Sequence, residues 1–161
     1  LLYSQQTYER RLVLATLATL PHRVPRTRRG DLRPLALERA LELVRQLMGD
    51  AEVMVQTALS WAIREWTTVD AEATATLLRA EAGIASKSGD GARAWVVRDS
   101  LSKQPPELVA DLKARLEGIH RDAKAPSTSI ASTHAAAFAA ALTSSHDAVA
   151  AQGDRYTRSR A

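Results

Sequence analysis

The chain has 161 residues, 45% of them hydrophobic and 25% charged, which is enough to bury one hydrophobic core. It contains no cysteine, which excludes a disulfide framework, thiolate metal ligands and a thiolate nucleophile. Lysine and arginine (22) outnumber aspartate and glutamate (18), which favours an anionic partner. No apolar run approaches the roughly 20 residues that cross a bilayer, so we expect no membrane span.

The hydrophobic periodicity predicts helices along the whole chain, because no stretch alternates with period two for long enough to form a sheet. The predicted helices are Ser4–Leu20, Leu32–Met48, Asp50–Thr67, Asp70–Gly83, Ala92–Ser102 and one from Pro105 to about Asp122. Pro21 and Gly49 end the first two, and Asp70 is expected to cap the fourth. Ser86–Gly91 is predicted to be a turn.

The segment between the first two helices is rich in arginine. Against one acid, Asp31, it carries Arg23, Arg26, Arg28, Arg29 and Arg33. A guanidinium pairs bidentately with phosphate, so this loop fits a nucleic-acid backbone. A solvated surface loop has the same composition, and both interpretations are open.

Trp61 lies away from the apolar stripe of its own predicted helix. That stripe, within about 100° of arc, comprises Val55, Ala58, Leu59, Ala62 and Trp66. Trp61 lies roughly 120° from the centre of the stripe, on a face shared with Thr57 and Arg64. An aromatic ring beside a guanidinium on a polar face can hold a base or a cationic ligand. The alternative is that Trp61 fills a gap against a neighbouring helix.

The helices also show an internal repeat. Residues 8–15 align with residues 54–61 at an offset of 46 residues, and HEAT and armadillo-like repeats have periods of about 40–47 residues. In this alignment Tyr8 and Arg11 lie off the stripe of the first helix, as Trp61 does in the third. We therefore predict an all-α fold of antiparallel helix pairs stacked as a HEAT-like superhelix, with Arg11 and Trp61 on its concave surface.

These residues carry a resemblance to the DNA alkylation repair family, whose members are HEAT-like-repeat glycosylases that excise N3- and N7-alkylated purines. The family pattern of Asp, Val-Gln-Lys-Ala and Trp-x-Leu-Arg-Glu-aromatic is matched by Asp50, residues 55–58 (VQTA) and residues 61–66 (WAIREW). A supporting motif, an aromatic followed by two residues and an arginine, is matched by Tyr8 and Arg11.

The resemblance implies helices curved around a basic groove that takes duplex DNA. It implies a catalytic role for Trp61 through contact with the sugar or the cationic alkylated base. The residues expected to bind DNA, from the resemblance and the charge pattern together, are Tyr8, Arg10, Arg11, Arg26, Arg28, Arg29 and Arg64. Because an alkylated purine is already a good leaving group, such a site needs mainly to stabilise an oxocarbenium-like sugar and to position water.

One part of the family pattern is missing. The family's catalytic carboxylate sits in a Trp-Trp-Asp-type motif of a preceding repeat, and no Trp-Trp or Trp-Asp pair occurs in this chain. Thr57 also replaces a basic residue that is common in the family. Because Leu1 falls within a helical pattern, we expect the C-terminal part of a longer enzyme. The alternative is a relative that has lost the chemistry.

The resemblance extends weakly to Arg93 and Arg98, and Trp95 beside Arg98 is a candidate either for DNA contact or for the core. We expect residues 1–123 to form the helical repeat domain. Residues 124–161, rich in Ala, Ser and Thr, are expected to be a weakly packed or disordered appendage with one helix near His134–Gln152.

The four histidines lack metal-ligand spacing, so we expect no metal and no cofactor. The expected partner is duplex DNA containing alkylated purines, bound by a monomer at the nucleoid of the cytoplasm, without a membrane. A second class of function is a non-enzymatic helical-repeat scaffold that binds an acidic protein partner or DNA through the same arginines.

Overall fold

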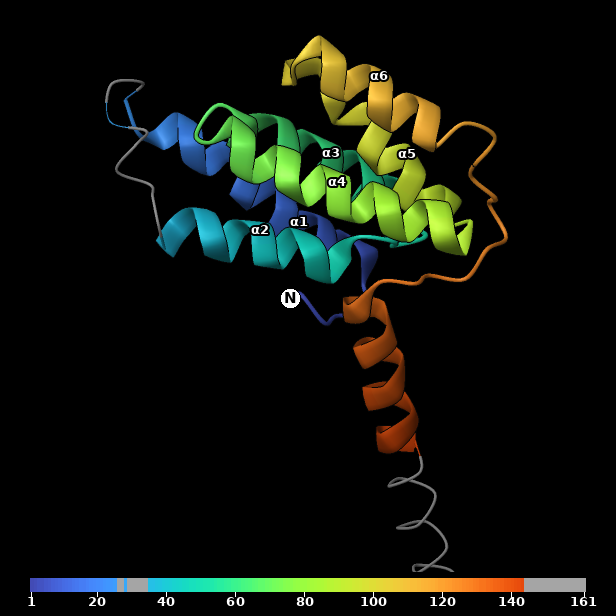
Figure 1. The fold of residues 1–161 in the computed structure, drawn as a ribbon. Helices are drawn as coiled ribbons and strands as arrows, with labels where there is room; N and C mark the ends of the chain where they lie inside the picture. Colours follow the sequence, from blue (N-terminus) through green and yellow to red (C-terminus); the bar gives the residue numbers. More distant parts are fainter. Residues whose placement is uncertain (26–27, 29–34, 144–161) are drawn as a thin grey trace, which may run out of the picture.

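The computed structural model describes residues 1–25, 28 and 35–143, and its regular elements are helices (Figure 1). They are α1 (Thr7–Thr19), the 3-10 helix η1 (Leu20–Arg23), α2 (Leu35–Leu47), α3 (Val53–Thr67), α4 (Ala71–Ser88), α5 (Gly91–Asp99), the 3-10 helix η3 (Leu101–Lys103) and α6 (Pro106–Arg115). A further helix covers residues 130–143. The described ranges contain no strand, which confirms the predicted all-α fold class.

The predicted helices are present, but several of their ends differ from the prediction by three residues or more, most clearly the ends of α4 and α6. Helix α4 continues through Gly83 to Ser88, so the predicted end at Gly83 was wrong, and so was the start of the turn at Ser86. The helix ends instead at Gly89, whose φ of 70° lies in the left-handed region that glycine adopts without steric cost. Helix α6 ends at Arg115, before the predicted Asp122, and Gly118 then takes a φ of 76°.

The helices stack in pairs along the chain. Helix α1 packs along α3, and α3 contacts α5. Helix α2 packs on α3, α4 packs on both α3 and α5, and α6 lies on α4 and α5. Each pair therefore buries its apolar faces against the next pair, which is the packing of an α–α superhelix.

The core is centred on α3. The predicted stripe of Val55, Ala58, Leu59, Ala62 and Trp66 is buried, as expected. Trp66 has no exposed surface, and its indole Nε1 donates a hydrogen bond to the backbone oxygen of Leu17 in α1 at 3.0 Å. This bond satisfies the one polar group of a buried tryptophan and joins the first helices of two successive pairs.

The segment after α6 returns to the start of the fold (Figure 1). The backbone N–H of Thr128 donates to the oxygen of Gly49 at 2.9 Å, and the Ser132 hydroxyl lies 3.2 Å from Oδ2 of Asp50. Ala131 and Ala135 are buried against the helices. The first part of the expected appendage is thus docked by specific contacts, while residues 144–161 lie outside the described residues. None of the described helices is long and apolar enough to span a membrane.

Candidate nucleic-acid interface

Helices α1 and α3 form a hollow of about 420 Å³. We call it the Trp61 groove, and its lining residues are Arg11, Ala15, Val53, Met54, Thr57, Ala58, Trp61 and Arg64. The structure therefore confirms that Arg11 and Trp61, 50 positions apart in the chain, share one surface.

The helical repeat of α3 places the groove residues. Thr57, Trp61 and Arg64 are spaced four and three residues apart, so they lie on one face of the helix. The buried stripe occupies the other side. Trp61 is half-buried: part of its indole packs against the core, and it still lines the groove. Both sequence-based interpretations of Trp61 thus describe part of its surroundings.

Arg11 and Tyr8 lie one turn apart on the exposed face of α1. The Tyr8 side chain is 69% exposed. Arg11 makes no ion pair with any residue that the structure describes, so its guanidinium is available to an anionic ligand.

Arg64 is held at the other end of the groove by Asp99. Its Nη1 donates to the backbone oxygen and to Oδ2 of Asp99, both at 2.8 Å. A guanidinium carries five N–H donors, of which Nη1 holds two. Within the described part of the chain, Nε and Nη2 of Arg64 make no hydrogen bond, so they can still donate to a ligand.

Arg10, expected to contact DNA, is buried, and that expectation was wrong. Its Nε donates to Oδ2 of Asp50 at 2.8 Å, and its Nη1 donates to the backbone oxygens of Ser4 and Gln5 at 2.8 and 3.0 Å. Arg10 is one residue, or about 100° of helix, from Arg11, so it faces the interior. Asp50 has no exposed surface, and a buried carboxylate requires such a partner.

The arginine-rich loop is described only in part. Arg26, Arg29 and Arg33 lie outside the described residues. Arg23 and Arg28 are both exposed, Arg23 at the end of η1. The loop follows α1, the helix that also carries Arg11.

Two further arginines named from the sequence are bound within the protein. Arg93 is buried and pairs with the Glu81 carboxylate, and burial raises the pKa of Glu81 although the nearby Arg93 acts to lower it. Arg98 donates to the backbone oxygens of Leu116 and Ile119 at 3.0 and 2.8 Å, and burial lowers its pKa. Both guanidinium groups therefore stabilise the packing of α5 against its neighbours.

Trp95 also has an internal partner. The guanidinium carbon of Arg121 lies 4.4 Å from the centroid of the Trp95 ring, a cation–π contact that joins α5 to the segment after α6. Of the two alternatives for Trp95, the structure favours packing over DNA contact.

Sequence reasoning gave no role to two acidic residues that make ion pairs with distant residues, Asp99 and Glu65. Oε2 of Glu65 lies 3.0 Å from Nε2 of His22 and accepts from Nζ of Lys103 at 3.2 Å. Glu65 falls within the matched motif of residues 61–66, but the partners of both acids lie at least 35 positions away and leave no local signal. Only the packing of α3 against its neighbours brings these acids to their partners.

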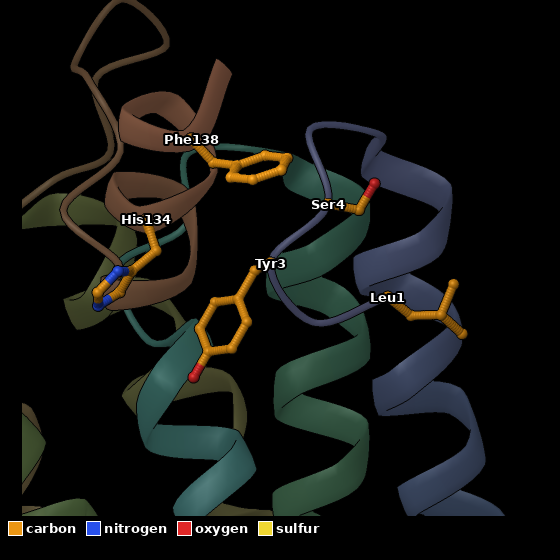
Figure 2. A pocket seen from close by; sticks show the side chains of 5 residues that line it. All are labelled: Leu1, Tyr3, Ser4, His134 and Phe138. Atoms are coloured by element: carbon orange, nitrogen blue, oxygen red, sulfur yellow. The ribbon is translucent and has the colours of Figure 1, made fainter. Parts of the chain in front are cut away.

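A second hollow, of about 580 Å³, lies at the N-terminal edge. Figure 2 shows His134 and Phe138 on the helix of residues 130–143, facing Leu1, Tyr3 and Ser4 of the N-terminal segment. Its lining is largely apolar and contains no arginine or lysine. It therefore lacks the charge that a phosphate backbone requires.

The Trp61 groove can bind an anion and a flat or cationic group, but it has no acid–base chemistry of its own. Its lining includes two arginines and one tryptophan, and no carboxylate or histidine. In the described part of the chain, no group of three or more histidine or acidic side chains could hold a metal ion. The arrangement is that of a binding surface.

Comparison with known families matches residues 1–103 to the family described as DNA alkylation repair enzyme. No curated protein and no solved structure matches the chain. The match includes α1 to α5 and hence every residue that lines the Trp61 groove. The chain therefore belongs to the DNA alkylation repair enzyme family, and its role is in DNA repair.

Proposed function

We propose that the Trp61 groove binds duplex DNA containing alkylated purines. The observation that carries the proposal is that Arg11 and Arg64 line the same groove as the half-buried Trp61. In this proposal Arg11 and Arg64 contact backbone phosphates, and the Trp61 ring contacts the alkylated base or its sugar. Tyr8, Arg26, Arg28 and Arg29 extend the contact along the backbone.

The Trp61 ring would give selectivity for damage through charge. A purine alkylated at N3 or N7 is a cation, whereas an undamaged purine is neutral. A cation–π contact contributes about 0.5–2 kcal/mol, which corresponds to roughly 2- to 30-fold in affinity. Phosphate contacts, by contrast, are the same for damaged and undamaged DNA, so they supply affinity without selectivity.

The proposed reaction of the family site is hydrolysis of the N-glycosidic bond. The bond between C1′ and the purine breaks, the alkylpurine leaves as a neutral base, and water adds to C1′ and releases a proton. A cationic base departs readily, so stabilisation of positive charge on the sugar is the main requirement. The groove lining contains no carboxylate, and we expect this chain to bind the lesion without excising the base.

The test is binding of fluorescent duplexes, with and without one 7-methylguanine, measured by anisotropy. We expect Trp61→Ala to reduce the preference for the damaged duplex and Arg11→Ala to weaken both duplexes equally. Arg79→Ala, which removes the same charge from an exposed position on α4, is the matched control and should change neither. The chain should release no 7-methylguanine in a single-turnover assay.

The scaffold alternative makes a different prediction. Equal affinity for both duplexes, and competition by an acidic polypeptide at similar concentrations, would favour a protein-binding scaffold. Salt dependence does not separate the two functions, because both interactions weaken in salt.

A further inference from the structure

The ion pair between Arg64 and Asp99 joins the Trp61 groove to the C-terminal end of α5, although no residue of α5 lines the groove. Asp99 is the last residue of α5 and accepts twice from one nitrogen, Nη1 of Arg64, through its backbone oxygen and its carboxylate. Two acceptors on one residue fix both the position and the direction of that edge of the guanidinium.

The electrostatics of this helix end favour a cation. The carboxyl-terminal carbonyls of α5 carry the negative end of its dipole, and the Asp99 carboxylate adds a full negative charge. Both side chains remain accessible to solvent, at 25% for Arg64 and 41% for Asp99. A pair this exposed contributes little to folding, so its main effect is on where the guanidinium points.

The ion pair of Arg64 and Asp99 also lies between two hollows. Arg64 lines the Trp61 groove, whereas Asp99 lines a neighbouring hollow of about 670 Å³ between α5, η3 and α6. The side chain of Arg64 therefore lies along the boundary of the groove, with Nε and Nη2 not bonded to any described residue.

Arg11 offers the contrast within the same groove. It has no ion pair among the described residues, so its side chain must be ordered when it binds a phosphate. Arg64 is ordered before any ligand arrives. Fixing one long side chain in advance is equivalent to about two- to tenfold in affinity.

We propose that Asp99 is a positioning residue that holds Arg64 at the edge of the Trp61 groove, so that its Nε and Nη2 donate to a backbone phosphate of the bound duplex. This inference rests on the proposed function of the groove. It adds to the binding site a residue that does not line the groove: Asp99 on α5 is needed for Arg64 on α3 to bind a phosphate at full affinity.

The test is duplex affinity in Asp99→Ala, Asp99→Asn, Arg64→Ala and the Asp99→Ala/Arg64→Ala double variant. We expect Asp99→Ala to weaken binding about fivefold, because Arg64 is then held only by the backbone oxygen and must be ordered further on binding. Asp99→Asn should keep at least the original affinity, because the amide oxygen still accepts from Nη1. In the Arg64→Ala background, Asp99→Ala should have no further weakening effect.

Asp111→Ala is the matched control, because it removes an exposed acid that also pairs with an arginine, Arg115 on α6. It measures the effect of one lost negative charge without any effect on the groove. A loss of affinity in Asp99→Asn as large as in Asp99→Ala would overturn the positioning role, and so would equal affinities of Asp99→Ala and Asp111→Ala.

A second measurement separates this inference from the proposed function. In ¹⁵N NMR of the free chain, the Arg64 guanidinium should show hindered rotation that Asp99→Ala, which leaves only the backbone oxygen as acceptor, reduces and Asp99→Asn retains. If the unaltered chain binds no duplex, the proposed function fails. If it binds duplex and Arg11→Ala weakens binding while Asp99→Ala does not, only the present inference fails.

Discussion

Trp61 and Trp66 lie five residues apart on α3, and this spacing gives the two side chains different roles. Trp66 is fully buried and donates to the Leu17 oxygen, whereas Trp61 is half-buried and lines the groove. The angle between them on the helix wheel was readable from the sequence. The hydrogen bond to Leu17 was not, because it crosses 49 residues.

This difference leads to a prediction about stability. Trp66→Ala should reduce the free energy of unfolding by about 3–5 kcal/mol, because it opens an interior cavity. It also leaves the Leu17 oxygen without its donor. Trp61→Ala should cost clearly less, since part of the indole already contacts solvent. Urea denaturation followed by circular dichroism measures both, and equal losses would show that Trp61 is chiefly a core residue.

The pair Arg10 and Arg11 shows the same principle for charge. The sequence presents two adjacent arginines, of which only Arg11 matches the family motif, although both were expected to bind DNA. One is buried with Asp50 and the other faces the groove. The helical turn of about 100° per residue decides that they differ. Arg10 falls on the buried face of α1 with Leu14 and Leu17, and Asp50, before α3, supplies the charge that it pairs with there.

At the scale of elements, α4 contains a glycine within the helix and another at its end. Gly83 has ordinary helical geometry and open space beside its Cα. Gly89 has a φ of 70° and ends the helix, with its N–H donating to the Ala85 oxygen at 2.9 Å. The prediction that Gly83 ends the helix failed because glycine alone does not distinguish an interior position from a cap.

The two glycines should therefore respond oppositely to alanine. Gly83→Ala should stabilise the protein by about 0.5–1 kcal/mol, because alanine loses less backbone entropy in a helix. Gly89→Ala should destabilise it by about 1–2 kcal/mol, because a side chain is strained at positive φ. Thermal melts of the two variants test this pair, and a stabilising Gly89→Ala would contradict the capping argument.

At the scale of the whole molecule, the segment after α6 connects the last helices to the first. Its contacts fall on Gly49 and Asp50, at the turn between α2 and α3. The region matched to the family ends at residue 103, so this segment lies beyond it. Such contacts restrain the stacking of successive helix pairs, which otherwise depends only on neighbouring pairs.

The distribution of arginine over the molecule gives a prediction about salt. Each arginine that neutralises a phosphate should contribute a little under one unit to the slope of log K against log salt concentration. Changing Arg26, Arg28 and Arg29 together to alanine should lower this slope by roughly two to three units if all three contact the backbone. Titrations at several salt concentrations measure it. The exposed Arg115 on α6 supplies a control substitution, and an unchanged slope in the triple variant would mean that the loop is only a solvated surface.

Local periodicity by itself determined the helical character of this protein, the buried stripe of α3 and the off-stripe position of Trp61. These properties depend on neighbours three to four residues apart, so a single sequence contains them. The tertiary structure alone decided that Arg10 pairs with Asp50, that Asp99 holds Arg64, and that Thr128 and Ser132 dock at the α2–α3 turn. Each of these contacts joins residues 35 or more positions apart. They arise only when whole helices pack, and no local pattern encodes which helix ends then meet.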